Sequence, residues 1–126
     1  MNALNLREMI GMVRRYNRIL DEDLRIALMN LRTLMAMRKN DEYLKAELKA
    51  MYSHLMFHGI LVESMEKGID VINALLIHSA YMVDYVRTIK SDKLSGEMLE
   101  LFEVVKKRTI AISQTESEIY NEVVGV

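Results

Sequence analysis

Cysteine and proline are absent from the 126-residue chain, and glycine occurs only five times. Without cysteine the chain has no disulfide framework and no thiolate ligand for a metal. Without proline, and with so few glycines, almost nothing interrupts a helix. Tryptophan is also absent and phenylalanine occurs twice, so we do not expect a surface on which nucleic-acid bases stack.

Neither sign of charge dominates, and no long apolar run is present. The 17 basic residues nearly balance the 18 acidic ones, which leaves a net charge of −1 and no overall attraction for nucleic acid or membrane. No stretch approaches the roughly 20 apolar residues of a membrane span, and no signal-peptide pattern is found. We therefore expect a cytoplasmic protein without membrane contact, formed by a single domain over residues 1–126.

Apolar residues repeat in alternating steps of four and three along nearly the whole chain. This period indicates helices that pack almost parallel to one another, and the first of them continues through Asp21–Asp23 without interruption. Short loops between four such helices predict an all-α, antiparallel up-down-up-down four-helix bundle with a long first helix. The helices are expected at about residues 4–38, 41–67, 71–89 and 96–123.

Polar residues and glycines mark the expected helix ends. Asn40 or Asp41 can cap the second helix, and Gly68 suits the left-handed position that follows it. Asp70 is the expected cap of the third helix, and Ser95 that of the fourth, after a loop over residues 90–97.

A second apolar stripe lies beside the core positions of the first helix. Because this helix is the longest, we expect its N-terminal third to protrude, fold back or pack on another chain. The chain contains 11 methionines, whose flexible side chains suit a groove that adapts to a partner helix. We expect the stripe to capture a protein partner or to form a homodimer, and Met12→Glu with Ile19→Glu to abolish binding without unfolding. The stripe consists of Met9, Met12, Tyr16, Ile19 and Ile26.

The same helix carries a row of arginines. Residues 1–39 have a net charge of +4 and the remainder has −5. One interpretation is a solvated face paired with acids of the fourth helix, such as Glu100 and Glu103. The other is a basic ridge for an acidic partner or a nucleic-acid backbone. Without interleaved aromatics, binding to nucleic acid is the weaker hypothesis. The ridge consists of Arg7, Arg14, Arg18, Arg25 and Arg32, followed by Lys39.

The three histidines fall at about one level of the predicted bundle. His58 and His78 are equally far from the turn at Gly68, and His54 lies one helical turn from His58. The same reflection about Asn40 brings Glu22, with its neighbours, to this level, and imidazole with carboxylate suits zinc, iron or copper.

A neutral histidine in the core is the alternative, and it is favoured because the Glu-x-x-His pairs of di-iron bundles are missing. We therefore expect no metal or other cofactor, and we expect His58→Leu to stabilise the fold. A glycine-rich phosphate loop and a Gly-x-Ser-x-Gly motif are also missing, so an enzyme is not expected.

The stretch ESMEKGIDVINALLIHSAYM, residues 63–82, resembles the central hairpin of flagellin-export chaperones. The Glu66-Lys67-Gly68 run matches, and Tyr81-Met82 falls at a similar spacing, over about half of the chain. The family's Ser-Pro start has no counterpart here. The resemblance implies an all-helical cytoplasmic protein that keeps an amphipathic helix of a secretion substrate from assembling early.

Three classes of function follow from these observations. The first is a non-enzymatic helical protein-binding module, such as a chaperone, an adaptor or a small subunit of a larger assembly. The second is a metal-binding bundle that uses His54, His58 and His78, and the third is a nucleic-acid-associated protein that uses the arginines. We predict the first, with the methionine-rich stripe as its binding surface.

Overall fold

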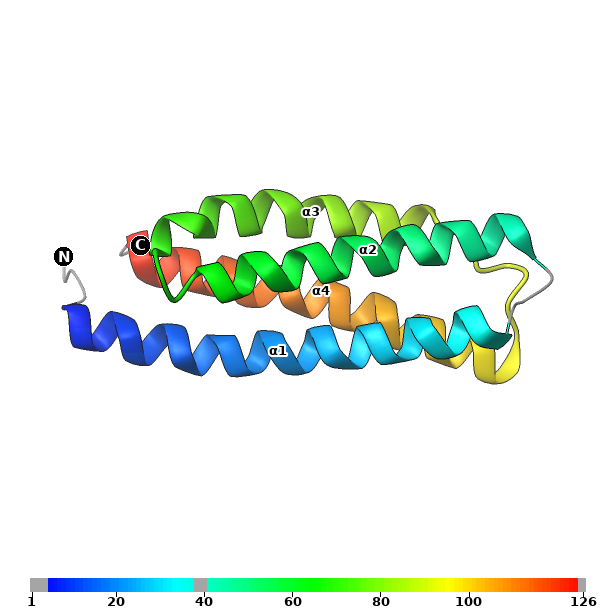
Figure 1. Cartoon of the computed structure of the whole chain (residues 1–126), viewed down its shortest axis with the longest axis horizontal. Helices are drawn as coiled ribbons and strands as arrows, with labels where there is room; N and C mark the ends of the chain where they lie inside the picture. The colour runs from blue at the N-terminus through cyan, green and yellow to red at the C-terminus, as the bar shows by residue number, and fades with distance from the viewer. Residues whose placement is uncertain (1–4, 38–40, 125–126) are drawn as a thin grey trace.

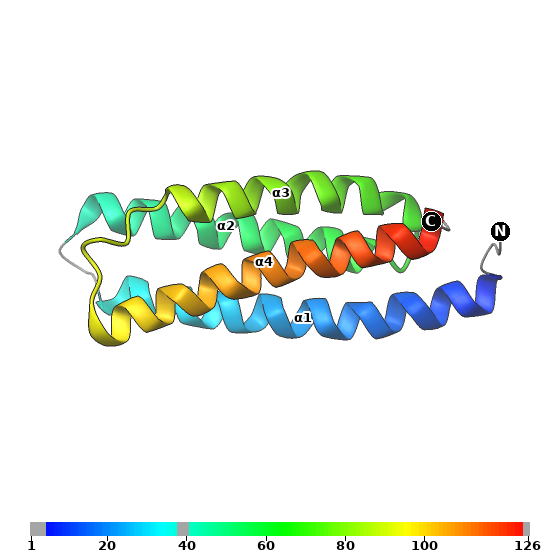
Figure 2. The same cartoon turned by 180° about the vertical axis from the view of Figure 1, so that it is seen from behind.

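The computed structural model describes residues 5–37 and 41–124, which form a bundle of four helices (Figure 1, Figure 2). Each helix packs against the next in the chain, and α1 also packs along α4, so the helices form an antiparallel up-down-up-down ring (Figure 1). The predicted all-α four-helix bundle with a long first helix is confirmed. The elements are α1 (Leu6–Met37), α2 (Glu42–Ser64), the 3-10 turn η1 (Ile69–Val71), α3 (Ile72–Thr88) and α4 (Gly96–Val124).

The first helix is continuous through its acidic stretch because the core positions continue on both sides of it. Leu20 and Leu24 are both buried, one turn apart. Asp23, between them, is also buried, and its Oδ1 accepts a hydrogen bond of 2.8 Å from Nη1 of Arg108 in α4. The pair joins α1 to α4 and compensates the buried carboxylate.

The start of α2 follows the expected capping chemistry. Oδ1 of Asp41 accepts a hydrogen bond of 3.0 Å from the backbone N–H of Leu44, which satisfies one of the free donors of the first turn. Asn40, the other candidate cap, lies outside the described residues. α4 begins directly after Ser95, as predicted.

Two predicted features of the α2–α3 turn are wrong. Gly68 is not in the left-handed conformation, because α2 already ends at Ser64 and Met65 continues in right-handed helical geometry. Asp70 does not cap α3, since it lies inside η1 and the cap position is Val71, which has no side-chain hydrogen bond there. The chain turns through right-handed and 3-10 geometry, so neither a left-handed glycine nor a carboxylate cap is required.

The predicted overhang of α1 is much shorter than expected. Leu6 is 74% exposed and Ile10 is 45% exposed, but Met12 is only 3% exposed. The reason is the length of α4, which has 29 residues against 32 in α1 and reaches the level of Tyr16. There the Tyr16 hydroxyl donates a hydrogen bond of 2.8 Å to Glu122. The N-terminal end of α1 projects beyond the other three helices (Figure 1).

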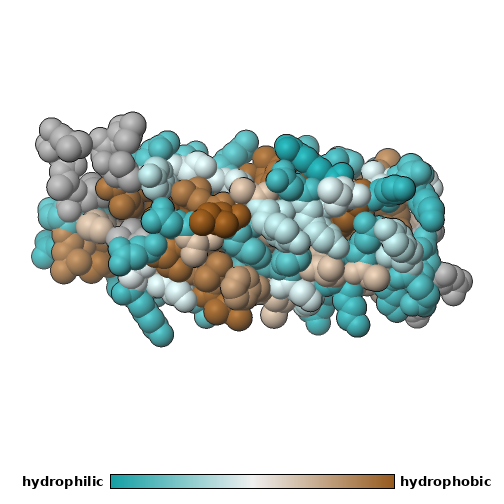
Figure 3. Space-filling model, turned by 90° about the horizontal axis from the view of Figure 1, so that it is seen from above, coloured by the Kyte–Doolittle hydropathy of each residue, from teal (hydrophilic) through white to brown (hydrophobic). Residues whose placement is uncertain are grey.

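The outer surface is of mixed polarity. From the side on which α3 lies uppermost, apolar areas are broken up by polar side chains along the length of the molecule (Figure 3). None of the helices in the described ranges is long and apolar enough to cross a membrane.

Candidate functional site

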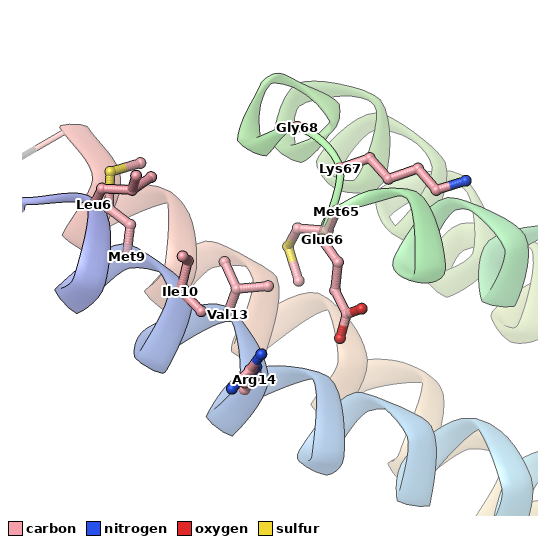
Figure 4. A pocket seen from close by; sticks show the side chains of 9 residues that line it. All are labelled: Leu6, Met9, Ile10, Val13, Arg14, Met65, Glu66, Lys67 and Gly68. Atoms are coloured by element: carbon pink, nitrogen blue, oxygen red, sulfur yellow. The ribbon is translucent and has the colours of Figure 1, made fainter.

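The seam between α1 and α2 contains two apolar hollows, and we name them the end hollow and the middle hollow. The end hollow, of about 400 Å³, lies between the projecting turns of α1 and the turn after α2 (Figure 4). Val13 and Met65 are buried at its base, whereas the apolar side chains nearer the tip of α1 are open to solvent. It is lined mainly by Leu6, Met9, Ile10, Val13, Met65 and Glu66.

The middle hollow, of about 510 Å³, lies farther along the same two helices. Two methionines and an isoleucine on its rim are about half exposed or more: Met29 at 53%, Met56 at 49% and Ile60 at 61%. Its floor is formed by the core residues Leu24 and Leu55. The two hollows together make a partly open apolar groove, referred to below as the α1–α2 groove.

A cluster of hydrogen-bond acceptors lies between the two hollows, along the seam of α1 and α2. Asp21 and Glu63 line the middle hollow, and Glu66 lines the end hollow. Asn17, only 7% exposed, donates from Nδ2 to Oε1 of Glu66 at 3.3 Å, but its own Oδ1 is buried without a partner. Partial burial and the charges of Glu63 and Glu66 raise the pKa of Asp21. These four residues are named the acceptor cluster, and within it the buried Oδ1 of Asn17 has no donor.

The apolar stripe predicted as a partner surface is not exposed as one continuous surface. Met12 and Tyr16 are buried in the core, at 3% and 8% exposure, and the Tyr16 hydroxyl bonds to Glu122 near the end of α4. Met9 is half-buried and lines the end hollow. Ile19 is 44% exposed and Ile26 is half-buried. The five residues therefore do not form one exposed stripe, and only Met9 belongs to the groove.

The five arginines of the predicted ridge are all exposed. Glu103 lies 4.0 Å from Lys106 of its own helix, and among the described residues the ion pairs between α1 and α4 join Arg15 to Glu122 and Asp23 to Arg108. Arg14 lines the end hollow, and Arg25 and Arg32 line the middle hollow, so these arginines border α2. Arg7 and Arg18 line neither hollow. Lys39 lies outside the described residues.

One histidine in the core bonds both to a second histidine and to a buried glutamate. His58, from α2, is fully buried, and its Nδ1 lies 2.9 Å from Nδ1 of His78 in α3. Its Nε2 is hydrogen-bonded to Oε2 of Glu116, a fully buried residue of α4. A connected chain of three ionisable side chains therefore runs from α4 through α2 to α3.

Burial shifts the pKa values of His78 and Glu116 in opposite directions. Burial, and to a lesser extent the neighbouring His58 and His54, lowers the pKa of His78 from 6.5 to about 4. Burial raises the pKa of Glu116, although the hydrogen bond from His58 and the Ser79 hydroxyl act in the opposite direction. Both shifts favour the uncharged forms, as expected for groups removed from water.

His54 lies near the other two but makes ring contacts rather than hydrogen bonds. Its ring centroid is 4.9 Å from that of Tyr81 in an edge-on arrangement and 5.7 Å from that of His78. Phe57 packs edge-on against His78 at 5.1 Å. The prediction that the three histidines lie at one level of the bundle is therefore confirmed. His54 packs there against the rings of Tyr81 and Tyr85.

The carboxylates expected to join the histidines do not reach them. Glu22 is exposed, Asp21 belongs to the acceptor cluster, and Asp23 pairs with Arg108. Reflection about a turn gives the level of a residue but not its direction around the helix, and this is why the expectation failed. Over residues 5–37 and 41–124, no group of three His, Cys, Asp or Glu side chains is spaced to hold a metal ion.

Glu116 is the functional candidate that the sequence analysis missed. A signal was present, because the core positions of α4 pass from Ile112 to Ile119, and the intermediate position in a four-three repeat is residue 116. A glutamate at a core position predicts a buried partner on another helix.

No family model matches the chain, and no curated protein or solved structure shows significant similarity to it. The class that the fold and the groove define is therefore a four-helix bundle with an open seam between its first two helices.

Proposed function

We propose that this chain is a non-enzymatic, cytoplasmic protein-binding module that holds an amphipathic helix of a partner protein in the α1–α2 groove. The observation that carries the proposal is the acceptor cluster between two apolar hollows. Exposed apolar area in a groove between two helices suits the apolar face of a third helix. A chaperone, an adaptor or a small subunit of an assembly would each use such a groove.

The dimensions of the groove set the length of the partner segment. From Leu6 to Arg32 the α1 side spans 27 residues, and its 26 steps cover roughly 39 Å at about 1.5 Å per residue. A partner helix of similar length would place apolar side chains in each hollow at three- and four-residue spacing. Between these two apolar groups, its surface meets the acceptor cluster.

Charge specifies the side chain at the middle of that helix. The acceptor cluster contains three carboxylates, of which Asp21 has a raised pKa, and the unpartnered Oδ1 of the buried Asn17. A lysine or arginine would supply a donor to Asn17 Oδ1 and offset the mutual repulsion of the carboxylates. A glutamate in its place would add another like charge. We infer a partner helix with the order apolar, basic, apolar.

Two synthetic helical peptides test this order directly. They are about 25 residues long and identical except for a central lysine or glutamate between two apolar groups. We expect the lysine peptide to bind roughly tenfold more tightly or better by fluorescence anisotropy, because like charges oppose the other peptide. Asp21→Asn with Glu63→Gln should remove most of this preference. Equal binding of both peptides, or binding of neither, would contradict the proposed function.

A pair of matched surface variants separates groove binding from general stickiness. Met56→Glu places a charge in the middle hollow, whereas Ile77→Glu places one on α3, where Ile77 is 73% exposed. Both should keep the helicity of the parent in circular dichroism. Met56→Glu should lose the lysine peptide and Ile77→Glu should retain it. The reverse pattern would locate the binding surface on α3 and refute the groove.

The alternative functions receive less support from the site. A three-histidine metal site competes with existing contacts, because both ring nitrogens of His58 already bond to Glu116 and His78. Nucleic-acid binding by the arginine ridge is expected to be weak, independent of base sequence and lost at physiological salt, since only about five phosphates could be met.

A further inference from the structure

Glu116 is a fully buried ionisable residue that lies outside the α1–α2 groove. Its Oε2 bonds to Nε2 of His58, and its Oε1 is buried without a hydrogen-bond partner, because the nearby Ser79 hydroxyl donates to the backbone carbonyl of Leu76 at 3.2 Å. An ionised carboxylate would carry charge on this unpartnered oxygen, which is costly away from water. A neutral carboxyl group would have only a carbonyl oxygen there, so the surroundings suit a protonated Glu116.

We propose that Glu116, His58 and His78 form a proton-binding site in the core, in which a proton taken up at His78 is stored on Glu116. The geometry provides the route. The Nδ1 atoms of His58 and His78 are 2.9 Å apart, so one must donate and the other accept. His78 is only half-buried, and neither of these hydrogen bonds uses its Nε2.

The transfer balances in protons and charge. In the deprotonated site, His58 donates from Nε2 to the Glu116 carboxylate and accepts at Nδ1 from Nδ1–H of His78. A proton then binds Nε2 of His78, which gives its Nδ1 proton to Nδ1 of His58. His58 gives its Nε2 proton to Glu116, so the site changes from −1 to neutral. Both imidazoles exchange one neutral tautomer for the other, and neither remains an imidazolium.

Few other charged groups face the site. From α4 and α3, the groups that act on Glu116 and His78 besides one another are the Ser79 hydroxyl and the histidines of α2, His58 and His54. From α1, the buried Asp23 is compensated by Arg108 and does not contribute to the pKa shift of Glu116. The raised pKa of Glu116 and the lowered pKa of His78 agree with a proton that resides on the glutamate.

Nuclear magnetic resonance of the full chain distinguishes this relay from independent titrations. With ¹³C-labelled glutamate and ¹⁵N-labelled histidine, one carboxyl group should titrate above the ordinary range for glutamate. At the same midpoint, His58 should move its proton from Nε2 to Nδ1, and His78 from Nδ1 to Nε2, as pH falls. Glu116→Gln is the matched control, since it keeps the shape of the side chain but cannot ionise, and it should abolish both tautomer changes.

Two results would overturn the proposal. One is an imidazolium at His58 or His78 at the midpoint, with Glu116 still ionised. The other is a Glu116 titration that leaves both tautomers unchanged. Because Glu116 lies outside the α1–α2 groove, peptide binding by Glu116→Gln should equal that of the parent chain, so either proposal can fail without the other.

Discussion

Replacing His58 alone leaves Glu116 without its hydrogen-bond partner in the core. A buried partner that is left alone is more costly than a pair replaced by apolar groups. We therefore predict that His58→Leu lowers the free energy of unfolding by about 2–4 kcal/mol. Chemical denaturation at neutral pH measures this change, and a more stable His58→Leu would show that the hydrogen bond to Glu116 is unimportant.

The double variant His58→Leu with Glu116→Leu is the control for that measurement. It removes both polar partners, so its stability should return to within about 1–2 kcal/mol of the parent or exceed it. If the two single changes simply add in the double variant, the two residues are not coupled in the way their contact implies.

The sign of the His58→Leu effect is opposite to the expectation from the sequence, and Glu116 is the reason. Periodicity identifies His58 as a core residue, and the structure agrees, since it is fully buried. Periodicity does not identify which polar side chain on another helix meets it, because that depends on how each helix is rotated about its axis. The level of the three histidines was therefore predictable, but the hydrogen bonds among them were not.

Among the elements, α1 shows how a long helix divides between core and surface. Met12→Glu puts a charge on a side chain that is 3% exposed, and it should destabilise the bundle by more than about 3 kcal/mol. Ile19→Glu changes a side chain that is 44% exposed on the same helix, and it should stay within about 1 kcal/mol of the parent. Thermal melts of the two single variants test this, and equal melting temperatures would contradict the burial of Met12 in the core.

The capping of α2 gives a second prediction at this scale. Asp41→Ala removes the hydrogen bond to the Leu44 N–H and should lower the free energy of unfolding by about 1 kcal/mol. Asp70→Ala, at the cap that was expected for α3 but does not form, should change it by less than about 0.5 kcal/mol. Urea titrations of both variants provide the comparison, and a larger loss at Asp70 would reverse the assignment of caps.

Most of the fold follows from the period of the apolar residues, because four long amphipathic helices without proline have few other ways to bury their cores. The helix ends and the overhang of α1 were less predictable. They depend on how far α4 extends along α1, and a contact such as Tyr16 with Glu122 becomes visible only when the helices are placed side by side.

For the whole molecule, the two perturbed groups of the core act on stability in opposite directions as pH changes. The pKa of His78 falls from 6.5 to about 4 on folding, so between these values the unfolded chain binds the proton and the folded chain does not. Stability from this group is therefore lost as pH drops from 6.5 to 4. The pKa of Glu116 is raised on folding from 4.5, so above pH 4.5 the folded chain keeps the proton longer. Stability from this group is lost as pH rises through the folded-state pKa.

Two variants separate these opposing contributions when each is compared with the parent at every pH. Glu116→Gln removes the group whose contribution to stability is lost at high pH. The free energy of unfolding of this variant, relative to the parent, should therefore increase from pH 5 to pH 8. His78→Phe keeps a ring beside Phe57 and Tyr81 but removes the group whose contribution to stability is lost at low pH. The stability of this variant, relative to the parent, should therefore increase as pH falls from 7 to 5. Denaturant titrations across this range measure both differences, in which the other ionisable groups largely cancel. Difference curves of the same slope would show that the two side chains do not titrate in the directions that their burial dictates.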